Sequence, residues 1–364
     1  MSSAAGLLKT ALDTPALVVD LDAMAANIDR IARTCRENNI AWRPHTKGQK
    51  TPEIAHAEIG AGAIGITCAK LGEAEVMAGA GIRDILIANQ IVGRSKIRRL
   101  IALLDRADAI VAVDGLQNIS ELAEAASAGK KRLRIVIEVN IGMNRAGVEP
   151  GSAVVALAAA IARYPALQFS GLMGWESHST TIPDPSRKRA AVAQAIGLLT
   201  ASAAACRAAG HSPSIVSCGG TGTFPYCAEQ PGVTEIQAGG GIFGDEHYRT
   251  HHHVEFRRAL TMMTTVVSRP TSTRIIVDAG RKAMSGDAAM PLPIGIPGVQ
   301  SVKLSAEHAT IELSAGCWTP AVGDRVEFAV GYSDTTVHLH EEIYAVRGSG
   351  VEAVWRVSGR GKLK

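Results

Sequence analysis

The feature that most limits what this chain can fold into is an alternation of short β-rich runs with longer, alanine-rich runs of helical period. It extends from the start of the 364-residue sequence to about Val254. The expected strands are Ala41–Lys47, Ala63–Cys68, Asp84–Ala88, Ala109–Val113, Arg134–Val139, Gln168–Met173, Ser214–Cys218 and Thr234–Ala238. About eight strand–helix units at this spacing are typical of a parallel TIM-type barrel, with a doubly wound open sheet as the structural alternative.

Helices are expected between these strands, because the intervening runs carry apolar residues at helical spacing. They are Thr51–Ile59, Leu71–Gly79, Gly93–Asp105, Leu116–Ala128, Ala153–Ala162 and Arg187–Ala209. No GxGxxG motif opens a helix after an early strand, which disfavours a dinucleotide-binding sheet.

Beyond Val254 the pattern changes to short β-rich runs separated by turn residues. The expected strands are Leu260–Ser268, Thr273–Val277, Gln300–Leu304, Ala309–Leu313, Arg325–Val330, Thr336–Val346 and Val351–Val357. We therefore predict a barrel domain over residues 20–254 and a β-strand domain made of residues 1–19 and 255–364. The segment Leu17–Leu21 fits a strand in either domain.

Composition and charge exclude several classes of protein. A formal net charge of +4 without a sustained Lys/Arg stripe argues against nucleic-acid binding. The longest apolar runs, such as Ala153–Ala162, are too short to span a membrane, and the N-terminus does not resemble a signal peptide. Six scattered cysteines without a CxxC pair are typical of a reducing cytoplasm. We expect a cytoplasmic protein with neither a membrane nor a nucleic acid as partner.

A lysine at the end of the first expected barrel strand is the leading catalytic candidate. Strand alternation places Arg43, His45 and Lys47 on one side, which in a barrel can be the interior. Enclosure and neighbouring positive charge lower the pKa of an amine, as imine formation requires. The alternative is an ordinary solvated lysine at a strand end. Lys50 competes for the role, but it lies past the strand and is expected to be solvated.

Two glycine-rich segments follow the seventh and eighth expected strands. The first contains Gly219, Gly220, Thr221, Gly222 and Thr223, and the second contains Gly240 and Gly241. Small residues let backbone N–H groups converge on an anion, and the last two loops of such barrels are a common phosphate site. The alternative is a pair of flexible turns.

Arg145 follows the fifth expected strand and would lie at the mouth of the barrel. A buried arginine there needs a partner. Its alternative role is therefore a salt bridge to an acidic neighbour such as Glu138.

Taken together, these motifs resemble the D-threonine aldolase / D-serine dehydratase-like family, whose barrel is related to that of alanine racemase. The matching segments are Asp13–Ile28, Arg43–Lys47, Ala69–Gly93, Asn144–Val148, Gly219–Thr223, Glu235–Tyr248 and Asp278–Met284. The resemblance implies an α/β fold, with a pyridoxal-phosphate-binding TIM (β/α)8 barrel of the alanine-racemase type and a C-terminal all-β domain. It also implies a small amino-acid substrate and a homodimer.

The resemblance assigns roles to individual residues. Lys47 matches the lysine that holds pyridoxal 5'-phosphate as a Schiff base, and His45 belongs to the same R-P-H-x-K pattern. Arg145 matches the arginine that meets the pyridine nitrogen; an always-charged donor keeps that nitrogen unprotonated and weakens the ring as an electron sink. The loop from Gly219 to Thr223 matches the phosphate cradle. His178 lies where the family carries polar residues that line the site, and it is a second catalytic candidate.

The departures from the family pattern concern a divalent metal. The family usually binds one through H-x-D or H-x-C, whereas this chain has Tyr332 at the histidine position and retains Asp334. His338 and His340 would share a strand face and could complete a shifted site with Asp334 for Mn, Mg or Zn. The alternative is a pair of ordinary surface histidines. Gln49 replaces another family histidine, and Gly240-Gly241 replaces a usual Ser-Tyr.

The activity that the resemblance favours is retro-aldol cleavage of β-hydroxy D-amino acids to glycine and an aldehyde. A dehydratase that yields a 2-keto acid and ammonia is the first alternative. The family's dehydratases tend to carry cysteine where this chain has Asp334, which favours the aldolase. Further alternatives are a racemase with Tyr332 as second base, and a non-catalytic cofactor carrier. Carriers lack the C-terminal β domain that is expected here.

Overall fold

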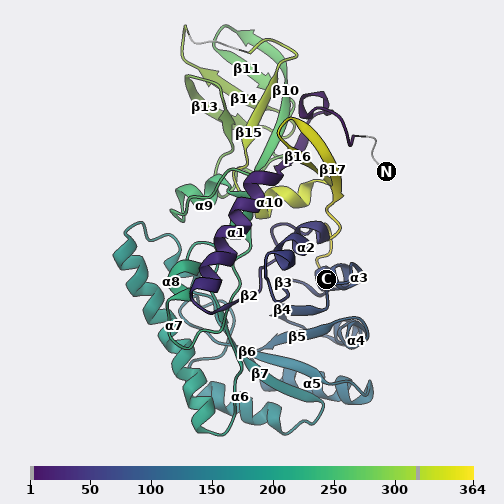
Figure 1. Ribbon diagram of the computed structural model, residues 1–364, viewed down its shortest axis with the longest axis vertical. Coiled ribbons are helices and arrows are strands. Elements are labelled where there is room, and N and C mark those ends of the chain that lie inside the picture. Colours follow the sequence, from purple (N-terminus) through teal and green to yellow (C-terminus); the bar gives the residue numbers. More distant parts are fainter. Residues whose placement is uncertain (1–3, 317–319) are drawn as a thin grey trace. The chain divides into compact units, whose positions relative to one another are not determined.

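The protein is described from a computed structural model that covers residues 4–316 and 320–364. The chain divides into two compact units (Figure 1). The barrel unit contains residues 30–47, 52–239 and 361–364, and the sheet unit contains the residues up to Asp29, 48–51 and 240–360. This division assigns residues 240–254 to the sheet unit, whereas the sequence led us to end the barrel at 254.

The barrel unit contains eight parallel strands in the order β2-β9-β8-β7-β6-β5-β4-β3. Their bounds are β2 Ala41–Trp42, β3 Ile66–Cys68, β4 Asp84–Gln90, β5 Asp108–Val113, β6 Leu133–Glu138, β7 Leu167–Met173, β8 Ile215–Cys218 and β9 Glu235–Ile236. A parallel bridge between His45 and Thr67 joins the two ends of this order, so that the sheet closes on itself. The expected eight-stranded barrel is confirmed.

Helices alternate with these strands at the six expected places. They are α2 Pro52–Gly60, α3 Leu71–Gly79, α4 Arg94–Leu103, α5 Leu116–Ala128, α6 Ser152–Ala162 and α7 Pro185–Ala208. A short helix, α8 Phe224–Ala228, follows β8. Helix α7 is long and apolar enough to cross a membrane by length and composition alone. It is, however, a layer of the barrel, since Val192, Ile196 and Leu199 are buried and the helix packs on β7, β8 and α6.

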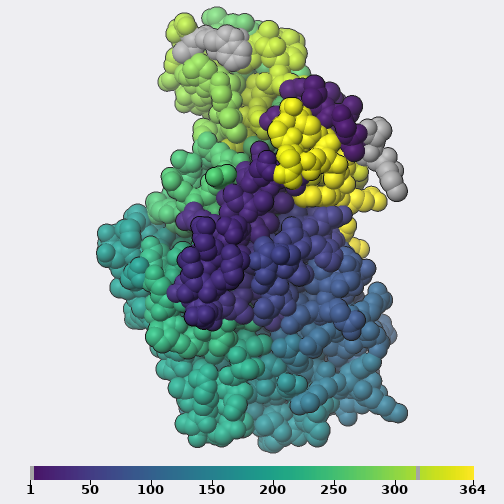
Figure 2. All heavy atoms as spheres, viewed as in Figure 1, coloured from purple at the N-terminus to yellow at the C-terminus, as the bar shows by residue number. Residues whose placement is uncertain are grey.

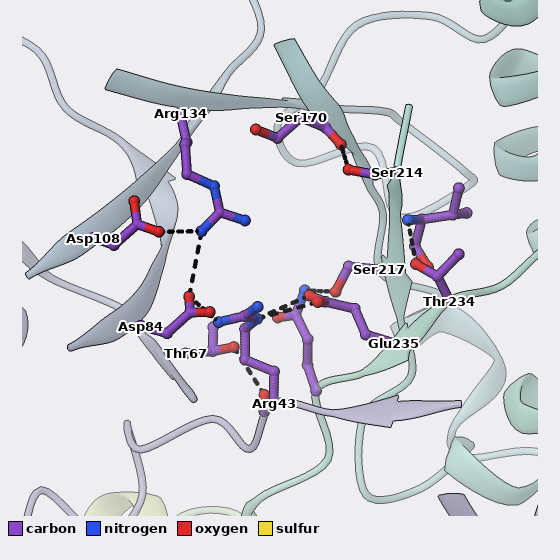
Figure 3. A network of polar contacts seen from close by, with 12 residues as sticks. Arg43, Thr67, Asp84, Asp108, Arg134, Ser170, Ser214, Ser217, Thr234 and Glu235 are labelled. Atoms are coloured by element: carbon purple, nitrogen blue, oxygen red, sulfur yellow. Dashed lines mark hydrogen bonds and ion pairs between the residues drawn. The ribbon is translucent and has the colours of Figure 1, made fainter. Parts of the chain in front are cut away.

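A network of charged side chains lies inside the barrel (Figure 3). Arg43, with only 2% of its side chain exposed, donates through Nε to both oxygens of Glu235 at 3.2 Å and through Nη1 to Asp84 at 2.7 Å. Arg134 extends the network to Asp108, with a distance of 2.8 Å between Nη1 and Oδ2. Arg43 therefore points into the barrel, as the strand alternation predicted, but it binds Glu235 and Asp84 there.

The sheet unit contains nine strands that are mostly antiparallel. They are β1 Ala16–Asp20, β10 Leu260–Thr271, β11 Arg274–Val277, β12 Leu292–Ile294, β13 Val299–Leu304, β14 Ala309–Leu313, β15 Arg325–Ala329, β16 Glu342–Arg347 and β17 Gly350–Arg356. Strand β1 pairs antiparallel with β10 and parallel with β16, which settles the place of Leu17–Leu21. The purple N-terminal segment and the yellow C-terminal strands accordingly adjoin in Figure 2.

Helix α1, Leu21–Glu37, has no counterpart among the expected elements. Its buried apolar side chains are spaced at helical intervals and are Met24, Ile28, Ile31, Ala32 and Cys35. The Asp20 carboxylate accepts the N–H of Ala23 at 2.8 Å and so caps its first turn.

The expected strand Thr336–Val346 is wrong over its first half. Residues Ser333–Thr336 form helix α10 and Val337–Leu339 form a 3-10 turn, so that β16 begins only at Glu342. Ser333, Thr336 and Val337 are fully buried, and a spacing of three and four residues is helical, not extended. Other short helical segments are Lys9–Ala11, Ser177–Ser179, Gly240–Phe243 and α9 Glu246–Thr250.

Candidate active site

Lys47 and Arg145 both lie close to the ring of one tryptophan, which the sequence analysis did not single out. The Nζ of Lys47 is 5.0 Å from the ring centroid of Trp175, and the Cζ of Arg145 is 5.5 Å from the same ring. Lys47 follows β2, Arg145 follows β6 and Trp175 follows β7. All three therefore lie at the carboxyl ends of barrel strands, where such barrels hold their active sites. The indole also faces Gly220, where a Cβ would be 2.8 Å from its Nε1. Trp175 thus lies beside three of the predicted cofactor-binding segments, those with Lys47, Arg145 and Gly220.

The segment around Lys47 is fixed by backbone contacts. The Nδ1 of His45 accepts the Lys47 N–H at 3.3 Å, and the N–H of Thr46 donates to Thr67 at 2.7 Å. Gly239 is packed so closely on His45 that a Cβ would collide with its backbone. Lys50, which we expected to be solvated, is only 9% exposed, so that expectation is wrong.

The guanidinium of Arg145 is more available than the sequence suggested. We expected a buried arginine, but 55% of its side chain is exposed. The alternative salt bridge is loose, since Nη2 is 3.8 Å from Glu138 Oε1, beyond normal hydrogen-bond distance. Burial is the main cause that raises the pKa of Glu138. Arg145 can therefore turn toward an acceptor other than Glu138.

A buried carboxylate that the sequence analysis missed lies behind the glycine-rich loop. Glu176 is fully buried and accepts the Thr223 hydroxyl at 2.5 Å. The N–H groups of Gly219 and Gly220 each lie 3.4 Å from its oxygens. Three predicted phosphate donors thus face Glu176. In the part of the chain that the structure describes, the Gly222 N–H donates to no protein group and could serve an anion.

His178 lies in the 3-10 turn Ser177–Ser179 beyond β7, and its side chain is exposed. It covers Gly142 of the loop after β6, where a Cβ would be 2.7 Å from its Cε1. His178 therefore lies beside the loop that carries Arg145, and its catalytic role stays a prediction.

Within the sheet unit, Gly240 and Gly241 open the 3-10 turn Gly240–Phe243. A Cβ at Gly240 would collide with the hydroxyl of Tyr248, a buried residue of α9. The phenol of Tyr248 is in turn hydrogen-bonded to Tyr332. The glycine at 240 is therefore required by the close approach of this tyrosine.

Asp334 occupies a definite position in the sheet unit. Its Oδ1 packs directly on Gly48, where a Cβ would collide with it, and Gly48 is covalently bonded to Lys47. Tyr332 hydrogen-bonds to Asp334; burial, followed by the charge of Asp334, raises the pKa of Tyr332 well above its usual range. Nearby, burial raises the pKa of Asp245 to about 7, although Ser333 and Tyr248 donate to it.

The three predicted metal ligands do not converge. His338 lies in a 3-10 turn, so the shared strand face expected for His338 and His340 is wrong. His340 Nε2 is 2.6 Å from the carbonyl oxygen of Ala283, and His338 Nδ1 is 3.3 Å from the backbone oxygen of Asp334. Among residues 4–316 and 320–364, the structure brings together one set of three His, Cys, Asp or Glu side chains that could hold a metal ion. Asp334 is not part of that set. Asp334, His338 and His340 therefore do not form a ready metal site.

A histidine at position 332, where the family usually has one, tests whether Tyr332 is the reason that Asp334 lacks a metal site. A Tyr332→His variant should bind Mn(II) at least about tenfold more tightly than the wild type, because a neutral imidazole is a good ligand and a phenol with a raised pKa is not. Electron paramagnetic resonance of free Mn(II) would measure the difference. Tyr344→His, a change of the same type on β16, should leave Mn(II) binding as it is. Equally tight binding by the wild type would show that Asp334 has other ligand partners.

The barrel residues fit pyridoxal phosphate. A primary amine, a guanidinium without a tight partner and a glycine-rich loop at the end of β8 match its aldehyde, ring nitrogen and phosphate. The indole of Trp175 offers an aromatic surface beside a pyridine ring.

Trp175 supplies an optical test of cofactor binding. Adding pyridoxal phosphate should quench part of the tryptophan emission of the wild type, and Trp175→Phe should lose most of that quenching while Trp355→Phe retains it. Trp175→Ala should bind the cofactor about tenfold more weakly, since such ring contacts contribute roughly 0.5–1.5 kcal/mol. Quenching that survives in Trp175→Phe would place the cofactor away from this ring.

Comparisons with known proteins agree with this geometry. The family model "Alanine racemase, N-terminal domain" matches residues 19–247, and "Putative serine dehydratase domain" matches residues 259–346. The chain is 33% identical to the 3-hydroxy-D-aspartate aldolase of Paracoccus denitrificans (strain Pd 1222), over 98% of this chain and 94% of the relative. It is 30% identical to the D-threo-3-hydroxyaspartate dehydratase of Delftia sp. (strain HT23), over 76% of this chain and 73% of the relative.

Among solved structures, the crystal structure of D-threonine aldolase from Filomicrobium marinum superposes with a TM-score of 0.96. The two chains are 35% identical, and the match covers 100% of each. The similarity therefore includes both the barrel and the C-terminal sheets.

Proposed function

We propose that the chain is a carbon–carbon lyase. It belongs to the pyridoxal-phosphate-dependent family that joins an alanine-racemase-type N-terminal domain to a serine dehydratase domain. It would cleave β-hydroxy D-amino acids by a retro-aldol reaction to glycine and an aldehyde. The arrangement of Lys47 and Arg145 about Trp175, beside the glycine-rich loop, carries the proposal.

Each residue has a role in this chemistry. Pyridoxal phosphate, when bound, supplies an electron-withdrawing system that stabilises negative charge at the substrate's Cα. Lys47 would hold the cofactor through its amine and would afterwards hold a proton near Cα. Arg145 would meet the ring nitrogen without giving up a proton, since a guanidinium stays charged. The N–H of Gly222 would donate to the phosphate.

Asp334 is the proposed base for the β-hydroxyl proton. Its carboxylate lies against Gly48, the residue that is covalently bonded to Lys47. Removing that proton lets the Cα–Cβ bond break, with the aldehyde leaving and the electron pair staying on Cα. A dehydratase would instead expel the hydroxyl group, and a carboxylate base does not assist that step. Asp334 therefore favours the aldolase.

A product assay tests the proposal directly. Purified protein with added pyridoxal phosphate would receive D-threonine, L-threonine, D-phenylserine and D-serine in turn, each with Mn(II) and again with chelator. Glycine plus an aldehyde from the D-substrates is the expected result. Ammonia plus a keto acid would instead identify a dehydratase, and inversion at Cα without cleavage would identify a racemase.

We also propose that the protein is a homodimer and that it is cytoplasmic. A homodimer follows from the family resemblance, and size-exclusion chromatography with light scattering would measure it. A cytoplasmic location is supported by the five described cysteines, which are all free thiols. Cys317 lies outside the described residues.

A further inference from the structure

Three side chains that can bind a metal converge beneath the glycine-rich loop of the barrel unit. They are Glu176 after β7, Cys218 at the end of β8 and Cys227 in α8. One carboxylate oxygen and the two sulfurs all lie within 4.8 Å of one another, and each side chain is at most 1% exposed. In the part of the chain that the structure describes, this is the one such set.

In the present state the cluster holds the loop through hydrogen bonds. Glu176 accepts the Thr223 hydroxyl, and the N–H groups of Gly219 and Gly220 lie 3.4 Å away, which is long for a hydrogen bond. Cys227 hydrogen-bonds to both Glu176 and Cys218, and burial raises the pKa of the Cys227 thiol well above its usual value. The three side chains are therefore linked to one another and to the loop by hydrogen bonds.

Two thiolates and a carboxylate are the donor set of a soft or borderline divalent cation. Sulfur ligands select zinc and its heavier relatives over magnesium or calcium. The exchange also balances: the cation forms two metal–sulfur bonds, and the two S–H protons leave to solvent. Since one dication replaces two protons, the net charge of the buried cluster does not change. Burial disfavours free thiolates because they add negative charge. It does not disfavour the metal-bound form in the same way, because that form adds no net charge.

We propose that Glu176, Cys218 and Cys227 form a binding site for a soft divalent cation of the zinc or cadmium class, and that its occupation weakens cofactor binding. A zinc–sulfur bond of about 2.3 Å places tetrahedral ligand atoms roughly 3.8 Å apart, which is compatible with three ligand atoms that lie within 4.8 Å of one another. Glu176 would then share its carboxylate with the cation and hold Gly219, Gly220 and Thr223 less firmly. The coupling to the cofactor rests on the proposed function, whereas the cation site does not.

The cation site is tested with the cofactor-free, full-length protein and Cd²⁺ alone as probe. We expect about one equivalent to bind, with a thiolate-to-cadmium absorption band in the near ultraviolet and about two protons released. Cys227→Ser and Cys218→Ser should each abolish the band. Cys206→Ser, which alters a buried cysteine outside the cluster, should retain it, and Mg²⁺ should produce none. A wild-type protein without the band would overturn the proposal, as would a band that survives in Cys227→Ser.

The coupling is tested by titrating pyridoxal phosphate into the cadmium-loaded and the metal-free protein. We expect at least tenfold weaker binding to the loaded form, and no effect of Cd²⁺ in Cys227→Ser. Equal affinity for both forms would overturn the coupling and leave the cation site and the proposed function standing. Failure of the metal-free wild type to bind the cofactor would instead overturn the proposed function. Thermal melting of each serine variant separates loss of the site from loss of the fold.

Discussion

Lys47→Ala is expected to abolish covalent cofactor attachment and to lower kcat by at least about 10³-fold, because positioned proton transfer alone contributes roughly 10²–10⁴-fold. Lys47 is the lysine that lies with Arg145 about the Trp175 ring. Intact mass after borohydride reduction in the presence of pyridoxal phosphate measures the attachment. The wild type should gain the mass of the reduced cofactor, and Lys47→Ala should not.

The matched control is Lys50→Arg. Lys50 is the other lysine in the segment, but it is only 9% exposed and its backbone oxygen accepts the N–H of Gly359 within the sheet unit. The arginine variant should keep both the mass gain and most of the activity. Attachment that persists in Lys47→Ala and disappears in Lys50→Arg would transfer the cofactor role to Lys50.

Arg43→Met is expected to lower the free energy of unfolding by about 3–5 kcal/mol, because it leaves Glu235 buried and unpaired. The side chains of Arg43 and Glu235 are 2% and 3% exposed (Figure 3). Arg134→Met in the same network should cost about 1 kcal/mol or less, since Arg134 is 22% exposed and its partner Asp108 is 63% exposed. Midpoints of urea unfolding compare the two variants.

A double variant makes this test sharper. Arg43→Met combined with Glu235→Leu removes both charges and should recover much of the loss, because buried ion pairs are often replaceable by apolar side chains. If the double variant is as unstable as Arg43→Met, an unpaired Glu235 is not the cause. Asp84, the second partner of Arg43, would then be the next residue to change.

The barrel was predictable because its signals are local. Buried strand segments such as Ala109–Val113 are continuous apolar runs, and α2 to α7 fill the intervals between strands at helical spacing. One error occurred where burial opposed local preference. Thr335, Thr336 and Val337 suggest a strand, but burial at positions 333, 336 and 337 selects a helical turn. Helix α1 was missed even though its apolar residues repeat at helical spacing.

The candidate site was predictable to the extent that it has sequence motifs. Lys47, Arg145 and the loop from Gly219 follow expected strands, and the structure brings Lys47 and Arg145 to the same indole. Trp175 and Glu176 have no motif of their own. Their importance comes from contacts with residues far away in the sequence, as in the hydrogen bond from Thr223 to Glu176. A glutamate shortly after the expected strand Gln168–Met173 was the one available signal.

The position of β1 has a consequence for how the chain is made. Residues 16–20 pair with β10 on one side and with β16 on the other, so this strand leaves the ribosome long before either neighbour exists. Until more than 240 further residues have been synthesised, its apolar run Ala16–Val19 has exposed hydrogen-bonding groups on both edges. The barrel strands β3 to β9, by contrast, pair with strands that are next to them along the chain. The first strand of the nascent chain is therefore where we expect chaperones to bind and premature pairing between copies to begin.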